Sequence, residues 1–131
     1  MTAILSESGM REAGRRVDPE LMMRAVASSG RIVREAGESL PDAEESINLL
    51  VSLVDDYWEG RYGSIPYWAV GAMVVALMSI IDSSSLVPDI LPAISLEERE
   101  SLLVLCLGMV EDELVLYRQW CRIKTKDGGS R

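Results

Sequence analysis

The stretch from Tyr62 to Ile81 contains no charged residue in twenty consecutive positions, and this limits the folds open to the chain. Such a run either crosses a membrane or lies at the centre of a helical protein. If Pro66 takes the first helical position, sixteen residues remain to Ile81, which is about 24 Å of helix against roughly 30 Å of hydrocarbon. We therefore predict a central core helix enclosed by other helices, in preference to a membrane span.

Two amphipathic helices are predicted before the apolar segment. The first begins at Asp18, a capping residue followed by Pro19, and should end near Gly37. The second begins near Pro41 and ends at Gly60. Its apolar residues follow helical spacing and predict one buried face, made of Ile47, Leu50, Val51, Val54 and Trp58.

The stretch "DSSSLVPDILPAIS", residues 82–95, follows the apolar segment. Pro88 and Pro92 exclude a continuous helix through it, because proline lacks the backbone donor and clashes with the preceding turn. We predict a folded corner of the form Pro-Asp-x-x-Pro in which Asp89 caps a short turn. The serines at 83–85 are interpreted as turn residues.

The last long helix is predicted to begin at a capping box formed by Ser95 and Glu98. It should run to about Arg122, with a bend near Gly108. Cys106 and Cys121 would then lie on one helix about 22 Å apart, too far for a disulfide, so both are expected to be free thiols.

The predicted fold is all-α: a single compact bundle of about four helices around the central apolar helix. Residues 1–16 mix glycine, serine and charge without apolar periodicity, so we expect a flexible N-terminal arm. Residues 17–122 form the single helical domain, and residues 123–131 are expected to be a disordered tail. The beginning of the sequence lacks the pattern of a secretory signal, and we expect a cytoplasmic protein.

From about residue 49 to residue 120 the chain resembles the YkvA-like domain family, small bacterial helical domains of unknown function. Their hallmark is a corner P-x-D-x-I-P-D-x-I-P-x-x-G-x-x-D-D between two apolar helices. This chain keeps Pro88, Asp89 and Pro92 in the matching places and carries Ser83 and Ser85 where the family has its first proline and first aspartate. The resemblance implies that a cation or partner held by the two corner acids of the family would here meet Asp89 alone.

Charge is unevenly distributed along a chain whose net charge is −8. Residues 1–34 carry +2, residues 35–121 carry −13 and residues 122–131 carry +3. An acidic body repels phosphate backbones and attracts basic proteins. We therefore expect a basic protein partner and no nucleic-acid binding through this body.

The sequence contains no histidine, which excludes Ser-His-Asp and Cys-His catalysis and histidine-ligated metals. It also lacks phosphate-binding and dinucleotide-binding glycine motifs, and we expect no cofactor. The remaining carboxylates are interpreted as solvated helix faces in preference to a cation site. The partner-binding candidates are Asp55, Asp56, Glu59, Trp58, Tyr62, Trp68, Asp89, Glu111, Asp112 and Glu113.

These features favour a binding protein over an enzyme. We interpret the chain as a small acidic interaction domain, of the kind that serves as an immunity protein or antitoxin by neutralising a basic toxin or nucleic-acid enzyme. The alternative is a membrane-associated or carboxylate-metal form of the YkvA-like domain. The identity of the partner and the formation of a homo-oligomer stay open.

Overall fold

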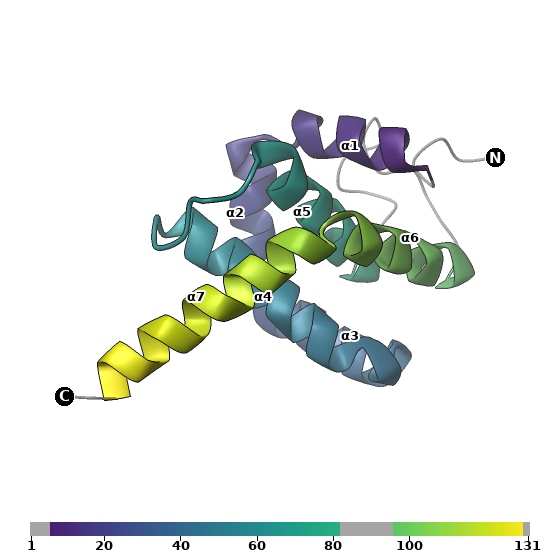
Figure 1. The fold of residues 1–131 in the computed structure, drawn as a ribbon. Coiled ribbons are helices and arrows are strands. Elements are labelled where there is room, and N and C mark those ends of the chain that lie inside the picture. Colours follow the sequence, from purple (N-terminus) through teal and green to yellow (C-terminus); the bar gives the residue numbers. More distant parts are fainter. Residues whose placement is uncertain (1–5, 82–95, 130–131) are drawn as a thin grey trace.

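The uncharged segment forms α5 (Tyr67–Ile81) at the centre of the computed structural model, which describes residues 6–81 and 96–129 (Figure 1). The other elements are helices as well: α1 (Glu7–Arg16), α2 (Pro19–Ala27), α3 (Ser29–Ser39), the short 3₁₀ helix η2 (Pro41–Ala43), α4 (Glu44–Trp58), α6 (Leu96–Met109) and α7 (Glu111–Gly129). The described residues contain no strand. The prediction of an all-α bundle around one apolar helix is confirmed, although this part of the chain holds more helices than the four expected.

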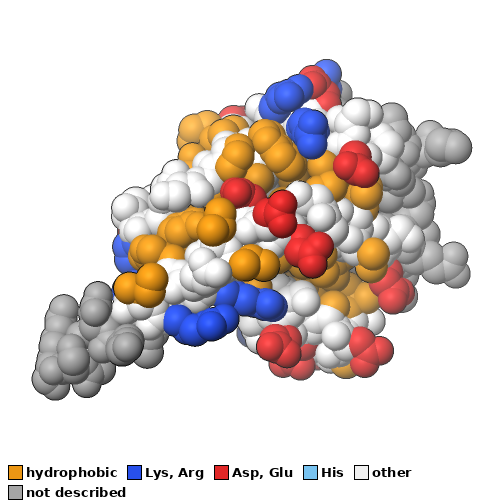
Figure 2. Space-filling view, in the orientation of Figure 1, with side chains coloured by type: hydrophobic (Ala, Val, Ile, Leu, Met, Phe, Trp, Pro, Cys, Tyr) orange, Lys and Arg blue, Asp and Glu red, His pale blue; other side chains and the backbone are white. Residues whose placement is uncertain are grey.

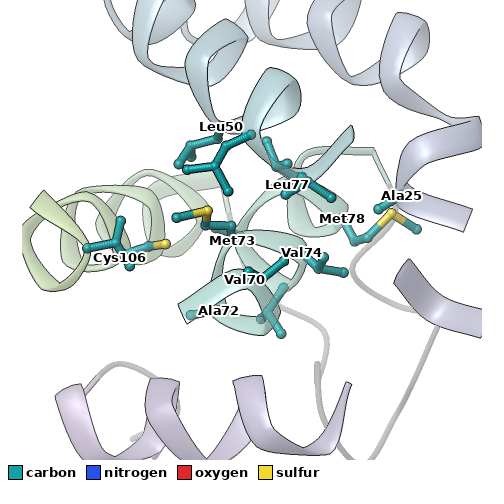
Figure 3. Packing of buried hydrophobic residues seen from close by; sticks show 14 of the residues in the cluster. Ala25, Leu50, Val70, Ala72, Met73, Val74, Leu77, Met78 and Cys106 are labelled. Atoms are coloured by element: carbon teal, nitrogen blue, oxygen red, sulfur yellow. The ribbon is translucent and has the colours of Figure 1, made fainter. Parts of the chain in front are cut away.

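The buried core lies around α5, which contacts α1, α2, α3, α4 and α6. Every residue from Ala69 to Ile80 is buried, because neighbouring helices cover all sides of this helix. Figure 3 shows Met73, Leu77 and Met78 of α5 among side chains of other helices, including Leu50 of α4 and Cys106 of α6. Within the described ranges no helix is both long and apolar enough to cross a membrane.

Residues 7–16, expected to belong to a flexible arm, form α1 and pack along α5. Ser6 caps this helix by accepting a hydrogen bond from the amide of Gly9 at 3.0 Å. The two helices approach closely at Gly14 and Gly71: a Cβ on Gly14 would lie 2.2 Å from the carbonyl oxygen of Trp68, and one on Gly71 would lie 2.0 Å from that of Gly14. The expectation was wrong because these glycines permit backbone contact and do not mark a mobile segment.

Two predicted helices are each divided in the structure. The segment expected to run from Asp18 to Gly37 is interrupted at Ser28, between α2 and α3, where serine and glycine follow one another and lower helix propensity. The last long helix is interrupted at Val110, between α6 and α7, rather than bent at Gly108. Cys106 and Cys121 therefore lie on different helices, and both are free thiols as predicted.

The expected disordered tail is also corrected, since α7 continues to Gly129. Extending a helix that is already nucleated costs little. Figure 1 shows the second half of α7, drawn in yellow, projecting away from the bundle. The corner of residues 82–95, with its candidate Asp89 and its serines, lies outside the described residues.

Candidate functional site

A buried hydrogen bond joins α4 to α7. The hydroxyl of Tyr117 donates to Oδ2 of Asp56 at 2.5 Å, and Oγ of Ser52 lies 2.9 Å from the same hydroxyl. Tyr117 is fully buried and Asp56 is only 9% exposed. A carboxylate at this depth requires such donors, because a buried charge without hydrogen bonds is strongly unfavourable.

The turn after α4 provides the second partner of Asp56. Nε of Arg61 donates to Oδ1 of Asp56 at 2.7 Å, and its Nη2 donates to Oδ2 of Asp55 at 2.9 Å. The turn is held by the carbonyl of Asp56, which accepts hydrogen bonds from the amides of Arg61 and Tyr62. Gly60 allows the reversal, since its φ of 78° lies in the left-handed region that glycine tolerates. The hydrogen bond to Asp56 raises the pKa of the exposed Arg61 guanidinium.

Aromatic rings pack around the hydrogen bond between Asp56 and Tyr117. Tyr62 lies edge-on to Tyr117, with ring centroids 5.1 Å apart, and Trp120 stacks on Tyr117 at 5.8 Å. Burial, together with the hydrogen bond to Asp56, raises the pKa of Tyr117 well above its usual range, so this tyrosine stays protonated as a donor. Burial also raises the pKa of Tyr62, with the nearby Glu113 carboxylate acting in the same direction.

We define the Asp56–Tyr117 cluster as the six residues Ser52, Asp56, Arg61, Tyr62, Tyr117 and Trp120. Both carboxylate oxygens of Asp56 already accept hydrogen bonds from the chain itself, which leaves it poorly suited to hold a basic partner. The cluster instead fixes the first half of α7 against the end of α4. It therefore sets the direction in which the second half of α7 leaves the bundle.

An apolar groove lies on another side of the molecule, between η2 and the exposed side of α6. One pocket of about 300 Å³ has Leu40 on one wall and Leu103, Val104 and Leu107 on the other. A neighbouring pocket of about 380 Å³ shares Leu107 and extends along the first turns of α7 to Val115. We refer to these two pockets together as the α6 groove. Val104 is 64% exposed, so the groove presents apolar surface to solvent.

Carboxylates rim the α6 groove. Asp42 and Glu100 line the first pocket, and Glu111 lines the second, where Arg118 is also present. None of the salt bridges among the described residues involves Asp42, Glu100 or Glu111. Figure 2 shows red acidic side chains spread over the body of the molecule. The groove therefore combines apolar walls with unpaired negative charge.

The structure separates the acidic candidates that the sequence placed together. Asp55 pairs with Arg61 and Asp56 is buried, so their interpretation as water-facing residues fails for Asp56. Glu111 and Asp112 are exposed in the first turn of α7, where negative charge suits the helix N-terminus. Glu113 is partly buried, and its Oε2 is buried without a hydrogen-bond partner in the described part of the chain. Glu59 is exposed at the end of α4.

The aromatic candidates lie in different environments. Tyr62 is buried in the Asp56–Tyr117 cluster, whereas Trp58 is exposed despite its predicted place on the buried face of α4. Trp68 lies in the first turn of α5, with the guanidinium of Arg11 of α1 4.6 Å from its ring centroid. No ring contact among the described residues joins these three side chains.

Arg61 and Tyr117 were not identified from the sequence as site residues. A signal existed for each. Arg61 is an isolated base in the acidic middle of the chain, five positions after Asp56, and Tyr117 lies three positions after Leu114 on the apolar face of α7. Neither signal says which carboxylate is the partner.

In the described residues, no three histidine, cysteine, aspartate or glutamate side chains gather in a way that could hold a metal ion. Comparison of the chain with protein-family models, with curated proteins and with solved structures found no match. The resemblance to the YkvA-like family stays a prediction.

Proposed function

We propose that this protein is an interaction domain whose α6 groove binds a basic amphipathic helix of a protein partner, as an immunity protein or antitoxin binds its toxin. The observation that carries this proposal is the combination of an apolar groove, in which Val104 and Val115 are exposed, with unpaired carboxylates at its rim. A helix bound in such a groove places apolar anchors inside and lysines or arginines at the edges. Negative charge around the groove also accelerates the approach of a basic partner.

The acidic surface that serves this purpose keeps Glu111 from the acidic residues expected from sequence and adds Asp42 and Glu100. Asp55 and Asp56 are held by Arg61, and Glu113 is partly buried. We therefore assign the attraction of a basic partner to Asp42, Glu100 and Glu111, which line the groove.

A pair of synthetic helical peptides tests the proposal. Both carry leucines on one face, and the opposite face carries lysines in one peptide and glutamates in the other. We expect the lysine peptide alone to bind, with an association rate that falls as salt screens the charges. Surface plasmon resonance on the immobilised protein measures both rates.

Charge-reversed variants locate the binding surface. Asp42→Lys with Glu100→Lys should slow association of the lysine peptide about tenfold or more. The control variant, Glu7→Lys with Glu59→Lys, reverses two exposed carboxylates that do not line the groove. It has the same net charge as the groove variant. Equal slowing in both variants would mean that net charge, and not the groove, attracts the peptide, and failure of the lysine peptide to bind would contradict the proposal itself.

A further inference from the structure

The projecting part of α7 carries an apolar stripe beside the Asp56–Tyr117 cluster, and the two share Trp120. Leu116, Trp120 and Ile123 are spaced i, i+4 and i+7, which places them along one side of the helix. Leu116 and Ile123 are exposed, the latter by 63%, and Trp120 is partly buried. This spacing is the one that a helix uses when it binds in a groove.

Basic residues flank this stripe. Arg122 and Lys124 are exposed on the two sides of the stripe, and Nζ of Lys124 lies 5.0 Å from the ring centroid of Trp120. Arg118 lies on the opposite side of α7, where it lines the α6 groove. Figure 2 shows orange apolar and blue basic side chains side by side along α7. We refer to residues 116–124 as the α7 arm. Its chemistry, apolar on one side and basic beside it, complements that of the α6 groove.

Arg118 of the α7 arm lines the groove of its own chain, but the apolar stripe does not line it and cannot turn back into it. The helix is continuous from Glu111 to Gly129, and its first half is held by the bond between Tyr117 and Asp56. Ile123 lies thirteen residues beyond the break at Val110, which is about 20 Å along the helix axis. A return to α6 would require α7 to break.

We propose that the α7 arm of one copy of this chain binds in the α6 groove of a second copy, and that the second copy returns the same contact. Each contact would bring Arg122 or Lys124 towards Asp42, Glu100 or Glu111. Reciprocal exchange closes into a symmetric dimer, because both copies use the same two surfaces. The inference rests on the proposed function of the groove, and it implies that a cognate partner must displace the arm of the second copy.

Analytical ultracentrifugation of the full chain tests the inference. We expect a dimer for the unmodified protein. Ile123→Glu in the arm and Val104→Glu in the groove should each weaken dimerisation about tenfold or more, because each places a charge at an apolar anchor of the contact. Both positions are more than half exposed, so the fold should survive. The matched control is Met23→Glu, an exposed methionine on α2 outside arm and groove, which should dimerise like the unmodified protein.

Mixing the two weakened variants adds a test that depends on reciprocity. The Ile123→Glu copy keeps a working groove and the Val104→Glu copy keeps a working arm, so together they should form a heterodimer with one intact contact. A monomer at all concentrations, or a dimer unaffected by either variant, would overturn the inference. A dimer lost in Ile123→Glu but kept in Val104→Glu would overturn it too, since α7 would then pair outside the groove.

The two proposals fail separately. A monomeric chain that still binds the lysine peptide refutes the second-copy inference and leaves the proposed function intact. A chain whose dimer depends on Val104 and Ile123, but whose groove binds no lysine peptide even in the Ile123→Glu variant, where the competing arm is weakened, refutes the proposed binding of a foreign basic helix.

Discussion

At the scale of single residues, Asp56 and Tyr117 depend on each other. Tyr117→Phe would keep the ring packing but leave Oδ2 of Asp56 buried without the hydroxyl that donates to it. Loss of one partner of a buried charged hydrogen bond typically costs about 1–3 kcal/mol. We therefore expect the free energy of unfolding to fall by about that amount, as measured by urea denaturation. The control is Tyr57→Phe on α4, whose partly buried ring has no hydrogen bond to lose among the described residues, and a similar loss there would contradict a special role for Tyr117.

The same tyrosine makes a pH dependence testable. Burial and the bond to Asp56 raise the pKa of Tyr117 above its ordinary value of 10.0. Its contribution to stability is complete below about pH 10; as the pH rises further, the unfolded chain loses this proton first and the free energy of unfolding falls. Tyr117→Phe should reduce this fall. Part should persist in the variant, because burial raises the pKa of Cys106 to about 12 and acts in the same direction.

At the scale of elements, the contact between α1 and α5 depends on two glycines. Gly14→Ala would place its Cβ 2.2 Å from the carbonyl oxygen of Trp68, so α1 must move away from α5. Overpacking of this kind typically costs about 1–3 kcal/mol. We expect a lower melting temperature and faster amide hydrogen exchange in residues 7–16.

Gly37→Ala is the matched control at this scale. Gly37 lies in α3, and a Cβ added there would meet nothing within 4 Å beyond its chain neighbours and the backbone of its own helix. Alanine should therefore stabilise the helix by up to about 1 kcal/mol. The two glycine variants should thus shift the melting temperature in opposite directions. A neutral result for Gly14→Ala would show that α1 is only loosely held against α5.

At the scale of the whole molecule, net charge is a source of repulsion. The chain carries 21 acidic and 13 basic residues. The repulsion among the excess negative charges should weaken as salt screens them. We expect the melting temperature to rise as sodium chloride is added. Glu38→Gln with Glu59→Gln should raise it in low salt and reduce the gain from added salt, because these exposed carboxylates lie near the C-terminal ends of α3 and α4, where negative charge opposes the helix dipole. A melting temperature that falls with salt would mean that attractive pairs such as Arg61 with Asp55 and Asp56 dominate.

The sequence by itself determined the central helix. The absence of charge from Tyr62 to Ile81 leaves no side of this segment suited to water, so its burial follows whichever helices surround it. The start of α2 could also be predicted from the sequence. The side chain of Asp18 accepts a hydrogen bond from the amide of Leu21, only three residues further along the chain. Features of this kind depend on neighbours along the chain.

The tertiary structure alone decided which polar residues are buried and how α1 is held. Asp56 and Asp55 are adjacent and chemically alike, and what distinguishes them is Tyr117, which lies 61 positions away from Asp56. Gly14 acquires its role only because Gly71 of α5 lies across from it. Helical periodicity records interactions over one or two turns, whereas these contacts depend on where distant helices pack, and the free energy of that packing is shared over the whole core.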